Sequence, residues 1–404
     1  MNCAFEAWLE RNRGRVLLAV LVCVYGTALV WTESLTQPIR ADEEHFWATT
    51  HDYFLEPLPP SAETLRSYPE LITPLSYILW GQLERWTGSG VVAGRVLNLV
   101  LSVLVLVLLA GSLRDPPAAG LGAVLGLLLY PYFLALGVHF YTDMIGAFLL
   151  VLGLHQHLRG KLASSCVLFV LAIATRQYLV QVPAAIALWE GLRWLRGEES
   201  AHWSKGLAPG LACASIFGWI AFWGGLAPQP GIDRWVPLYP APMMSPFHFV
   251  LHYGLYFLAT LGAYFAVVEA AVFRSLPSRR ELAQPWVALV ALGLVVLFAL
   301  APPLLQDGHR GGAFGRVTQT LLDGSIGNPL RMLFYYALAL FAVVRLGLAG
   351  GLPLLITLLG VVLAMKSQIP WEKYLFPCLL PLWYLRSRPD RPGGLAALGE
   401  PRSG

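Results

Sequence analysis

Charge is the property that this sequence has least of. Asp, Glu, Lys and Arg make up only 13% of the 404 residues, whereas the hydrophobic types make up 56%. Soluble globular domains carry charge on about a quarter of their residues. The formal net charge of +4 is modest and does not suggest a nucleic-acid-binding protein. A bilayer is the solvent that best explains the deficit of charge.

Cysteine and lysine are also scarce. The five cysteines are scattered and four of them lie in apolar runs, so the sequence predicts neither a disulfide framework nor a metal cluster. Only four lysines are present, so nearly all of the positive charge is arginine. This arginine bias hints at a GC-rich bacterial genome.

Apolar runs of about 17–25 residues recur along the chain, which is the length that a membrane-spanning helix needs. Lipid offers no hydrogen-bond partners to the backbone, so these runs should be helices. We therefore predict an all-α integral membrane protein. Arg11, Arg13 and Arg15 precede the first run, and no convincing cleavage site follows it. We expect a retained first helix over roughly 16–33 that begins in the cytoplasm.

The stretch 71–86 decides the topology, because it is short and is interrupted by Pro74, Gly81, Glu84 and Arg85. If it lies in the outer leaflet without spanning, the later clusters of basic loop residues all fall inside, as the positive-inside rule requires. If it spans, they fall outside. We therefore predict about twelve helices with both termini in the cytoplasm. Beyond the first helix, the predicted spans are 91–113, 118–139, 141–158, 162–177, 178–192, 207–226, 247–273, 285–306, 329–345, 350–366 and 374–386.

This topology treats residues 1–404 as one polytopic membrane domain. The first non-cytoplasmic loop, 34–90, should carry short interfacial helices; a second such loop covers 307–328, and 389–404 form a cytoplasmic tail. Ionisable residues at the membrane boundary are costly and usually functional. Because acids and bases converge on the non-cytoplasmic face, we predict a reaction centre there rather than a path through the membrane.

The first outer loop holds the densest group of acids, Asp42, Glu43 and Glu44, followed by His45. Adjacent carboxylates repel one another, which can raise the pKa of one of them into the range of a general base. The alternative is a solvated helix N-terminus whose acids are stabilised by the helix dipole. The segment around Glu70, which closes the same loop, is interpreted as a plain turn without chemistry of its own.

Two further motifs lie where apolar runs meet almost without a loop. Tyr141-Thr142-Asp143 supplies a second acid; the alternative is an aspartate that caps the following helix. Arg176-Gln177 interrupts a long apolar stretch, and an arginine at this depth suits a phosphate group. The alternative for Arg176 is an ion pair with a carboxylate such as Asp143.

Later outer segments add cationic side chains. His309 and Arg310 lie in a glycine-rich segment without Walker spacing or a preceding strand, so a nucleotide loop is rejected. A lid or diphosphate clamp and an ordinary mobile loop remain as interpretations. Lys373 follows Trp371 and Glu372 at the last outer turn, where snorkelling and an aromatic belt would explain the lysine and the tryptophan.

Taken in order, these motifs resemble one family, the polytopic α-1,2-glucosyltransferases that use dolichyl-phosphate glucose to add the last glucose to the lipid-linked N-glycan precursor. The likeness covers most of the chain, with Asp143 and Lys373 standing where that family has Glu and Arg. The matching elements are Asp42-Glu43, Thr73-Pro74 with Tyr77, Arg95-x-x-Asn98, Tyr141-Thr142-Asp143, Arg176-Gln177, His309-Arg310, and Glu372-Lys373-Tyr374 with Pro377.

The resemblance implies a glycosyltransferase of the GT-C fold. Such an enzyme moves a hexose, here with glucose favoured, from a polyprenyl-phosphate donor to a hydroxyl of a glycan or lipid-linked acceptor, with inversion and at the non-cytoplasmic face. The implied partners are the lipid-linked donor, the acceptor and membrane lipids, with no nucleic acid. No cofactor is implied, and a divalent metal between Asp42 and Asp143 is not expected. The bacterial inner membrane is the favoured location, or the endoplasmic reticulum for a eukaryotic chain.

The resemblance also implies roles for individual residues. Asp42 or Glu43 would take the proton of the acceptor hydroxyl, and Asp143 would orient the acceptor or share that proton. The residues expected to bind the donor phosphate are Arg176, His309, Arg310, Lys373 and Arg95. The residues expected to contact the substrates are Glu44, His45, Tyr141, Gln177 and Glu372.

Two other functions fit the sequence. A related enzyme of the same fold would glycosylate a protein or an envelope lipid. A lipid-linked sugar transporter or flippase is the non-enzymatic alternative; it would be supported by polar residues at the bilayer midplane and by inverted repeats. The sequence shows no internal repeat, and its polar groups gather at one face.

Overall fold

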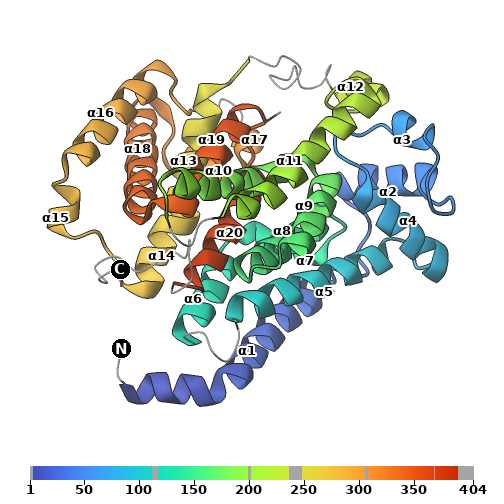
Figure 1. The fold of residues 1–404 in the computed structure, drawn as a ribbon, viewed down its shortest axis with the longest axis horizontal. Coiled ribbons are helices and arrows are strands. Elements are labelled where there is room, and N and C mark those ends of the chain that lie inside the picture. Colours follow the sequence, from blue (N-terminus) through green and yellow to red (C-terminus); the bar gives the residue numbers. More distant parts are fainter. Residues whose placement is uncertain are drawn as a thin grey trace. The chain divides into compact units, whose positions relative to one another are not determined.

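The computed structural model describes residues 3–111, 117–198, 202–235, 248–304, 308–367 and 369–389. Within these ranges every regular element is a helix and no strand is present (Figure 1). The all-α class predicted from the apolar runs is confirmed for this part of the chain.

In the described ranges, five helical segments are long and apolar enough to cross a membrane, and a bent pair of helices would make a sixth. The five lie in α1 (Cys3–Thr32), α5 (Val91–Ala110), α11 (Trp203–Trp223), the continuous run from α13 (Leu251–Leu261) to α14 (Val268–Phe273), and α18 (Gly324–Ala349). The pair is α6 (Pro117–Leu128) with α7 (Pro131–Val138). Shorter apolar helices are α8 (Asp143–Leu158), α9 (Leu162–Thr175), α16 (Pro285–Leu300) and α19 (Gly351–Met365).

The surface of α16 is that of a helix in lipid. One side packs against α18, while Leu289, Leu292 and Leu300 expose 70%, 63% and 75% of their surface. A row of large apolar side chains like this is an aggregation hazard in water and is favourable in a bilayer. Together with the long apolar helices, it supports a multi-pass membrane protein.

Every predicted span contains a helix. The predicted span 178–192 overlaps α10 (Gln181–Leu195), and the predicted span 374–386 contains α20 (Phe376–Arg386). The number of about twelve crossings stays a prediction. One predicted span is broken: residues 118–139 form two helices, and the second starts at Pro131. Proline lacks the N–H that would continue the hydrogen-bond ladder of the first.

The chain divides into two compact units. The first contains Met1–Leu121 and Tyr132–Tyr239, and the second contains Gly122–Pro131 and Pro240–Gly404. Each unit has a buried apolar cluster of its own, which includes Tyr77 in the first and Tyr256 in the second.

The segment 34–90 belongs to the first unit and carries short helices, as predicted: α2 (Asp42–Tyr53), α3 (Thr64–Ser67) and α4 (Leu75–Thr87). α2 packs on α4 through a cluster of buried rings that includes Phe46, Phe54 and Tyr77. The approach is close, because a Cβ atom on Gly81 would lie 1.9 Å from the Phe54 carbonyl oxygen. The aromatic cluster therefore fixes how α2 is rotated about its axis.

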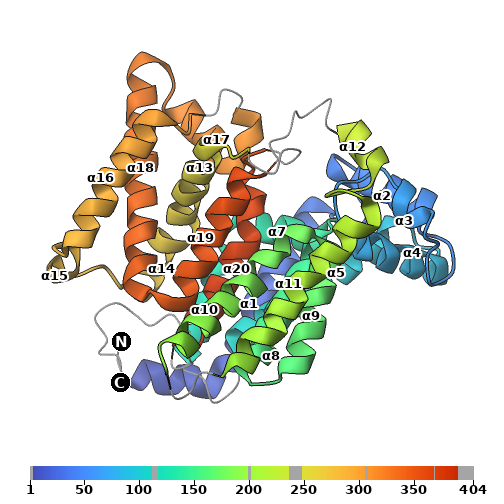
Figure 2. The same cartoon turned by 45° about the horizontal axis from the view of Figure 1, so that its top comes forward.

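In the same unit α8, α9 and α11 run side by side, with α10 against α11 (Figure 2). α9 ends at Thr175 because Arg176 is extended, with φ −155°, before the short helix η1 (Gln177–Val180). The predicted interruption at Arg176 is confirmed. The unit's described part ends with α12 (Gln229–Trp235).

In the second unit α13 packs against both α18 and α19, and continues through the π-helix η3 (Gly262–Val267). The helices α13 and α18 come very close, since a Cβ atom on Gly262 would lie 2.1 Å from the Leu338 carbonyl oxygen. The remaining elements are α15 (Arg279–Leu282), α17 (Gly308–Leu321) and η4 (Glu372–Leu375).

One expectation for this unit is corrected. Much of the segment 307–328, predicted to be a loop, is helical in α17 and the start of α18. The break that glycine introduces is local, at Gly312 with φ 85°. The backbone N–H of Gly315 donates to the Glu372 carboxylate, and such tertiary contacts override the weak helix propensity of glycine.

Candidate functional site

Glu43 is held in a closed ion pair. Its carboxylate accepts two hydrogen bonds from the Arg95 guanidinium, from Nε at 3.0 Å and from Nη2 at 2.6 Å. The backbone N–H of Phe140 donates a third at 2.6 Å. The two side chains are only 1% and 2% exposed, for Arg95 and Glu43 respectively. Two-pronged pairs of this kind are strong, and this one leaves Glu43 little access to a substrate.

The pair also sets the protonation of Glu43. Burial alone would raise the pKa of its carboxyl, but the hydrogen bonds from Arg95 and Phe140 and the Arg95 charge outweigh burial and lower it. Arg95 makes two more hydrogen bonds, because its Nη1 donates to the carbonyl oxygens of Leu35 and Gln37 at 3.1 and 2.8 Å. A carboxylate with a lowered pKa is a weak proton acceptor, which argues against Glu43 as the base.

Asp42 faces a different group although it adjoins Glu43. Its side chain is 25% exposed, and its Oδ1 lies 3.9 Å from Nε2 of His45, three residues along the same face of α2. The other ring nitrogen of His45, Nδ1, lies 2.8 Å from Oε1 of Glu70. We call this series of groups the Asp42–His45–Glu70 chain. It has a solvent-accessible carboxylate at one end and a buried one at the other.

Glu70 is fixed at the buried end. The residue is 4% exposed, and its Oε1 accepts a hydrogen bond from Thr49 Oγ1 at 3.2 Å. Arg234 of α12 places Nη1 3.8 Å from the same oxygen. The neighbouring Trp235 donates from its indole to the Pro69 carbonyl at 3.1 Å, which holds α12 on this loop. The carboxylate that closes the chain is thus anchored from two elements.

The His45 imidazole responds to its two carboxylate neighbours. Burial alone would lower the pKa of His45, but the hydrogen bond with Glu70 and the charges of Glu70 and Asp42 outweigh burial and raise it. The ring is 18% exposed and meets the Trp235 ring edge-on, with centroids 5.1 Å apart. The imidazole is therefore oriented, partly accessible and able to hold a proton.

Asp143 and Arg176 form a second closed pair in the first unit. Arg176 Nη2 donates to Oδ2 of Asp143 at 2.8 Å, and the Tyr178 hydroxyl donates to Oδ1 at 2.7 Å. Arg176 Nε also donates to the Thr142 hydroxyl at 2.8 Å. The side chains are 5% and 2% exposed, for Arg176 and Asp143 respectively. The structure therefore shows the ion pair that was the alternative to phosphate binding by Arg176.

The other predicted residues of this unit lie around these groups. Gln177 fastens the loop before α4: its amide donates to the Leu71 carbonyl at 2.5 Å and accepts from the Thr73 N–H at 3.2 Å. Tyr141 is half-buried and meets the Phe46 ring edge-on at 6.0 Å. Glu44 is exposed. Tyr141 and Glu44 are accessible to a substrate, whereas Gln177 supports the loop.

In the second unit Glu372 is surrounded by neutral donors. The hydroxyls of Tyr256 and Tyr264 and the N–H of Gly315 each donate to its carboxylate at 2.9 Å. Burial raises the pKa of Glu372, and these hydrogen bonds oppose only part of that effect. Lys373, which is also buried, places its ammonium 3.8 Å from the centre of the Trp371 ring.

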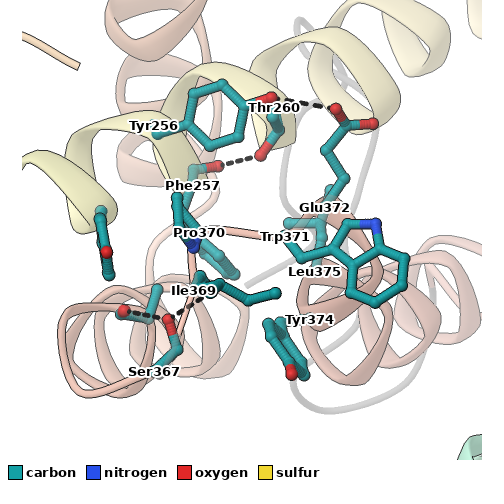
Figure 3. A pocket seen from close by; sticks show the side chains of 12 residues that line it. Tyr256, Phe257, Thr260, Ser367, Ile369, Pro370, Trp371, Glu372, Tyr374 and Leu375 are labelled. Carbon is teal, nitrogen blue, oxygen red and sulfur yellow. Dashed lines mark hydrogen bonds between the residues drawn. The ribbon is translucent and has the colours of Figure 1, made fainter. Parts of the chain in front are cut away.

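Glu372 also borders a small pocket (Figure 3). Figure 3 shows its carboxylate bonded to the Tyr256 hydroxyl, with the Trp371 indole and Tyr374 along the pocket wall. The empty space among its lining residues is about 240 Å³, part of which is open solvent. We assign no ligand to it.

The remaining predictions concern His309, Arg310 and metals. His309 and Arg310 lie in the first turn of α17, and their side chains fall outside the described residues. In the described ranges, no three His, Cys, Asp or Glu side chains form a group suited to a metal ion. Asp42 and Asp143, the pair considered for a metal, instead contact His45 and Arg176 respectively.

Glu70 and Arg234 are the residues of this region to which the sequence pattern assigned no role. The signal available for Glu70 was a carboxylate in the same predicted outer loop as the acids at 42–44. For Arg234 the signal was a basic residue in a loop that the topology placed outside.

Comparison with known proteins finds no matching family model, no matching curated protein and no matching solved structure.

Proposed function

We propose that this chain is an inverting, membrane-embedded glycosyltransferase. It moves a hexose, with glucose favoured, from a polyprenyl-phosphate donor to a hydroxyl of a glycan or lipid-linked acceptor. The observation that carries the proposal is the Asp42–His45–Glu70 chain, which offers an accessible carboxylate in a protein with several long apolar helices. The order of the motifs along the sequence, which resembles the lipid-linked glucosyltransferases, supports the choice of donor.

Asp42 is the proton acceptor in this proposal. The acceptor hydroxyl gives its proton to the Asp42 carboxylate while its oxygen bonds to the anomeric carbon of the sugar. The bond from that carbon to the phosphate oxygen breaks, and the electron pair leaves with the polyprenyl phosphate. A single displacement of this kind inverts the anomeric centre. Glu43 keeps its Arg95 partner throughout and is assigned a structural role.

The leaving phosphate needs fixed positive charge in the transition state. Arg95 and Arg176 are bonded to Glu43 and Asp143, so we assign them to holding those carboxylates. Lys373, His309 and Arg310 are the remaining predicted phosphate ligands. No metal or other cofactor is required, because cationic side chains can neutralise a single phosphate.

The non-cytoplasmic face is the proposed place of reaction. The positive-inside rule puts the first outer loop there, and the donor would enter from the bilayer. A bacterial inner membrane is the favoured location, because arginine dominates the basic residues.

The test is sugar transfer by the purified protein from a panel of polyprenyl-phosphate sugars to glycan and lipid-linked acceptors. We expect the wild type to transfer one of these sugars and Asp42→Asn to lose about 10²–10⁴-fold in rate, the usual contribution of a general base. Asp52→Asn is the matched control: it removes an exposed carboxylate of α2 whose ion pair among the described residues is with exposed His51. It should transfer at the wild-type rate.

Lack of transfer from every lipid donor, together with movement of lipid-linked sugar across vesicles, would replace this proposal with the flippase. Transfer to a protein or an envelope lipid alone would keep the enzyme class and change the acceptor.

A further inference from the structure

We propose that Glu70 is a positioning residue for the proposed transfer: it orients His45 so that the imidazole stores the proton that Asp42 takes from the acceptor. The inference rests on the proposed function and adds to it a residue in the Tyr-Pro-Glu segment, which the sequence pattern marked as a plain turn.

The geometry specifies one arrangement of the imidazole. With its hydrogen on Nδ1, His45 donates to Glu70 at 2.8 Å, and Nε2 is left as an acceptor on the side of Asp42. The hydrogen bond at one ring nitrogen fixes which nitrogen remains free to receive a proton. Nε2 and Asp42 are 3.9 Å apart in this structure, and the transfer of the proton requires this distance to shorten to a hydrogen bond.

The protons balance in this arrangement. Before reaction, neutral His45 lies between two carboxylates. Asp42 receives the proton of the acceptor hydroxyl and passes it to Nε2, which leaves an imidazolium flanked by the charges of Asp42 and Glu70. The proton then leaves to solvent or to the departing phosphate, and His45 is neutral again for the next turnover. No oxidant, metal or other reactant is needed.

The charged groups that face His45 are few among the described residues. Asp42 comes from its own helix, Glu70 from the loop after α3, and Arg234 from α12 lies beyond Glu70 at 3.8 Å from its oxygen. The two carboxylates stabilise the imidazolium, and Arg234 weakens the effect of Glu70. Changes at Glu70 and at Arg234 should therefore move the protonation of His45 in opposite directions.

A second His–carboxylate contact on α2 lacks the buried carboxylate that the Asp42–His45–Glu70 chain has. His51 lies 3.1 Å from Asp52, but these side chains are 57% and 61% exposed and water screens their interaction. Glu70, by contrast, is 4% exposed and held by Thr49. Burial makes its charge effective on the imidazole, and the bond from Thr49 keeps the carboxylate in place.

The experiment combines an NMR titration of the His45 ring with the pH dependence of sugar transfer. Since neutral His45 is the active form, kcat should rise with pH through the pKa of His45. In Glu70→Gln the loss of a charge within hydrogen-bond distance should move the titration and the acidic limb of kcat to lower pH by about 1 unit or more. The maximal kcat should fall more than KM changes.

Arg234→Gln is the second variant, and its 41% exposed side chain makes it tolerant of substitution. It should move both curves to higher pH, by less than 1 unit because the arginine is partly screened. The Arg234→Gln variant keeps the inference testable if Glu70→Gln does not fold. Asp52→Asn should move neither curve.

An unchanged His45 titration in the folded Glu70 or Arg234 variants overturns the inference, as does a titration that moves while the acidic limb of kcat stays in place. The titration needs no sugar donor. If it moves as expected in a protein that transfers no sugar, it supports the coupling of His45 to Glu70, and the failure belongs to the proposed function.

Discussion

Glu43 in the first unit and Glu372 in the second are both buried carboxylates, but their partners differ. Glu43 accepts its hydrogen bonds from the Arg95 guanidinium and one backbone N–H, whereas Glu372 accepts them from tyrosine hydroxyls and backbone N–H groups. The pKa of Glu43 is lowered although burial alone would raise it, while the pKa of Glu372 is raised by burial. A charged partner keeps a buried acid ionised, and neutral partners allow it to take up a proton.

The comparison also shows what a reactive acid in this chain requires. Glu43 is ionised but enclosed, and Glu372 is enclosed with no charged hydrogen-bond partner in its described surroundings. The Asp42–His45–Glu70 chain combines a buried, fixed end with an accessible end. We therefore place proton transfer at Asp42.

The largest expected effect comes from breaking the Glu43–Arg95 pair. Arg95→Met leaves a buried carboxylate without its cation, and removing one partner of a buried pair typically costs about 3–5 kcal/mol. Glu43→Gln should cost a similar amount. The measurement is the free energy of unfolding of the detergent-solubilised protein at neutral pH.

The double variant Glu43→Gln with Arg95→Met sharpens the result. It leaves no uncompensated charge, so its loss of stability should be smaller than the sum of the two single losses. Additive losses would contradict a direct interaction between the two side chains.

The second expected effect is a smaller one, on how the free energy of unfolding changes with pH. Between the unfolded pKa of Glu372, about 4.3, and its raised folded pKa, the folded state holds more protons than the unfolded state. Stability should therefore fall as pH rises through this window. For Glu43 the sign is opposite: its contribution is present above the unfolded pKa and is lost as pH falls through the lowered folded pKa.

Glu372→Gln should remove the fall in stability above about pH 4.3. It should also cost about 1–3 kcal/mol, because the new amide NH₂ meets donors where an oxygen accepted them. Thermal unfolding across the acidic to neutral range measures both, with Asp52→Asn as a control whose slope matches the wild type. A slope that persists in Glu372→Gln would show that another group carries it.

The helical class was predictable because a bilayer forces every apolar run into a helix. The break at Arg176 was also predictable, since a charged residue divides two apolar segments at that point. The ion pair of Arg176 with Asp143 was foreseen only as an alternative. The sequence shows that both side chains lie at helix ends but does not give their distance.

The separate roles of Asp42 and Glu43 were not predictable. Neighbouring residues on a helix point about 100° apart, so the rotation of α2 decides which acid meets Arg95. That rotation is set by the packing of rings such as Phe46 against residues distant in sequence. The bond between His45 and Glu70 spans 25 residues, and the bond between Tyr256 and Glu372 spans 116. No local pattern records such contacts.

The measurement that tests the central claim most directly compares sugar transfer by two variants in the same assay. One is Asp42→Asn, and the other is the Glu43→Gln, Arg95→Met double variant, each confirmed to be folded. We expect the double variant to keep transfer within about tenfold of the wild type, because an enclosed pair performs no proton transfer, and Asp42→Asn to lose about 10²–10⁴-fold. Full transfer by Asp42→Asn with none by the folded double variant would assign the proton to Glu43 and contradict the account.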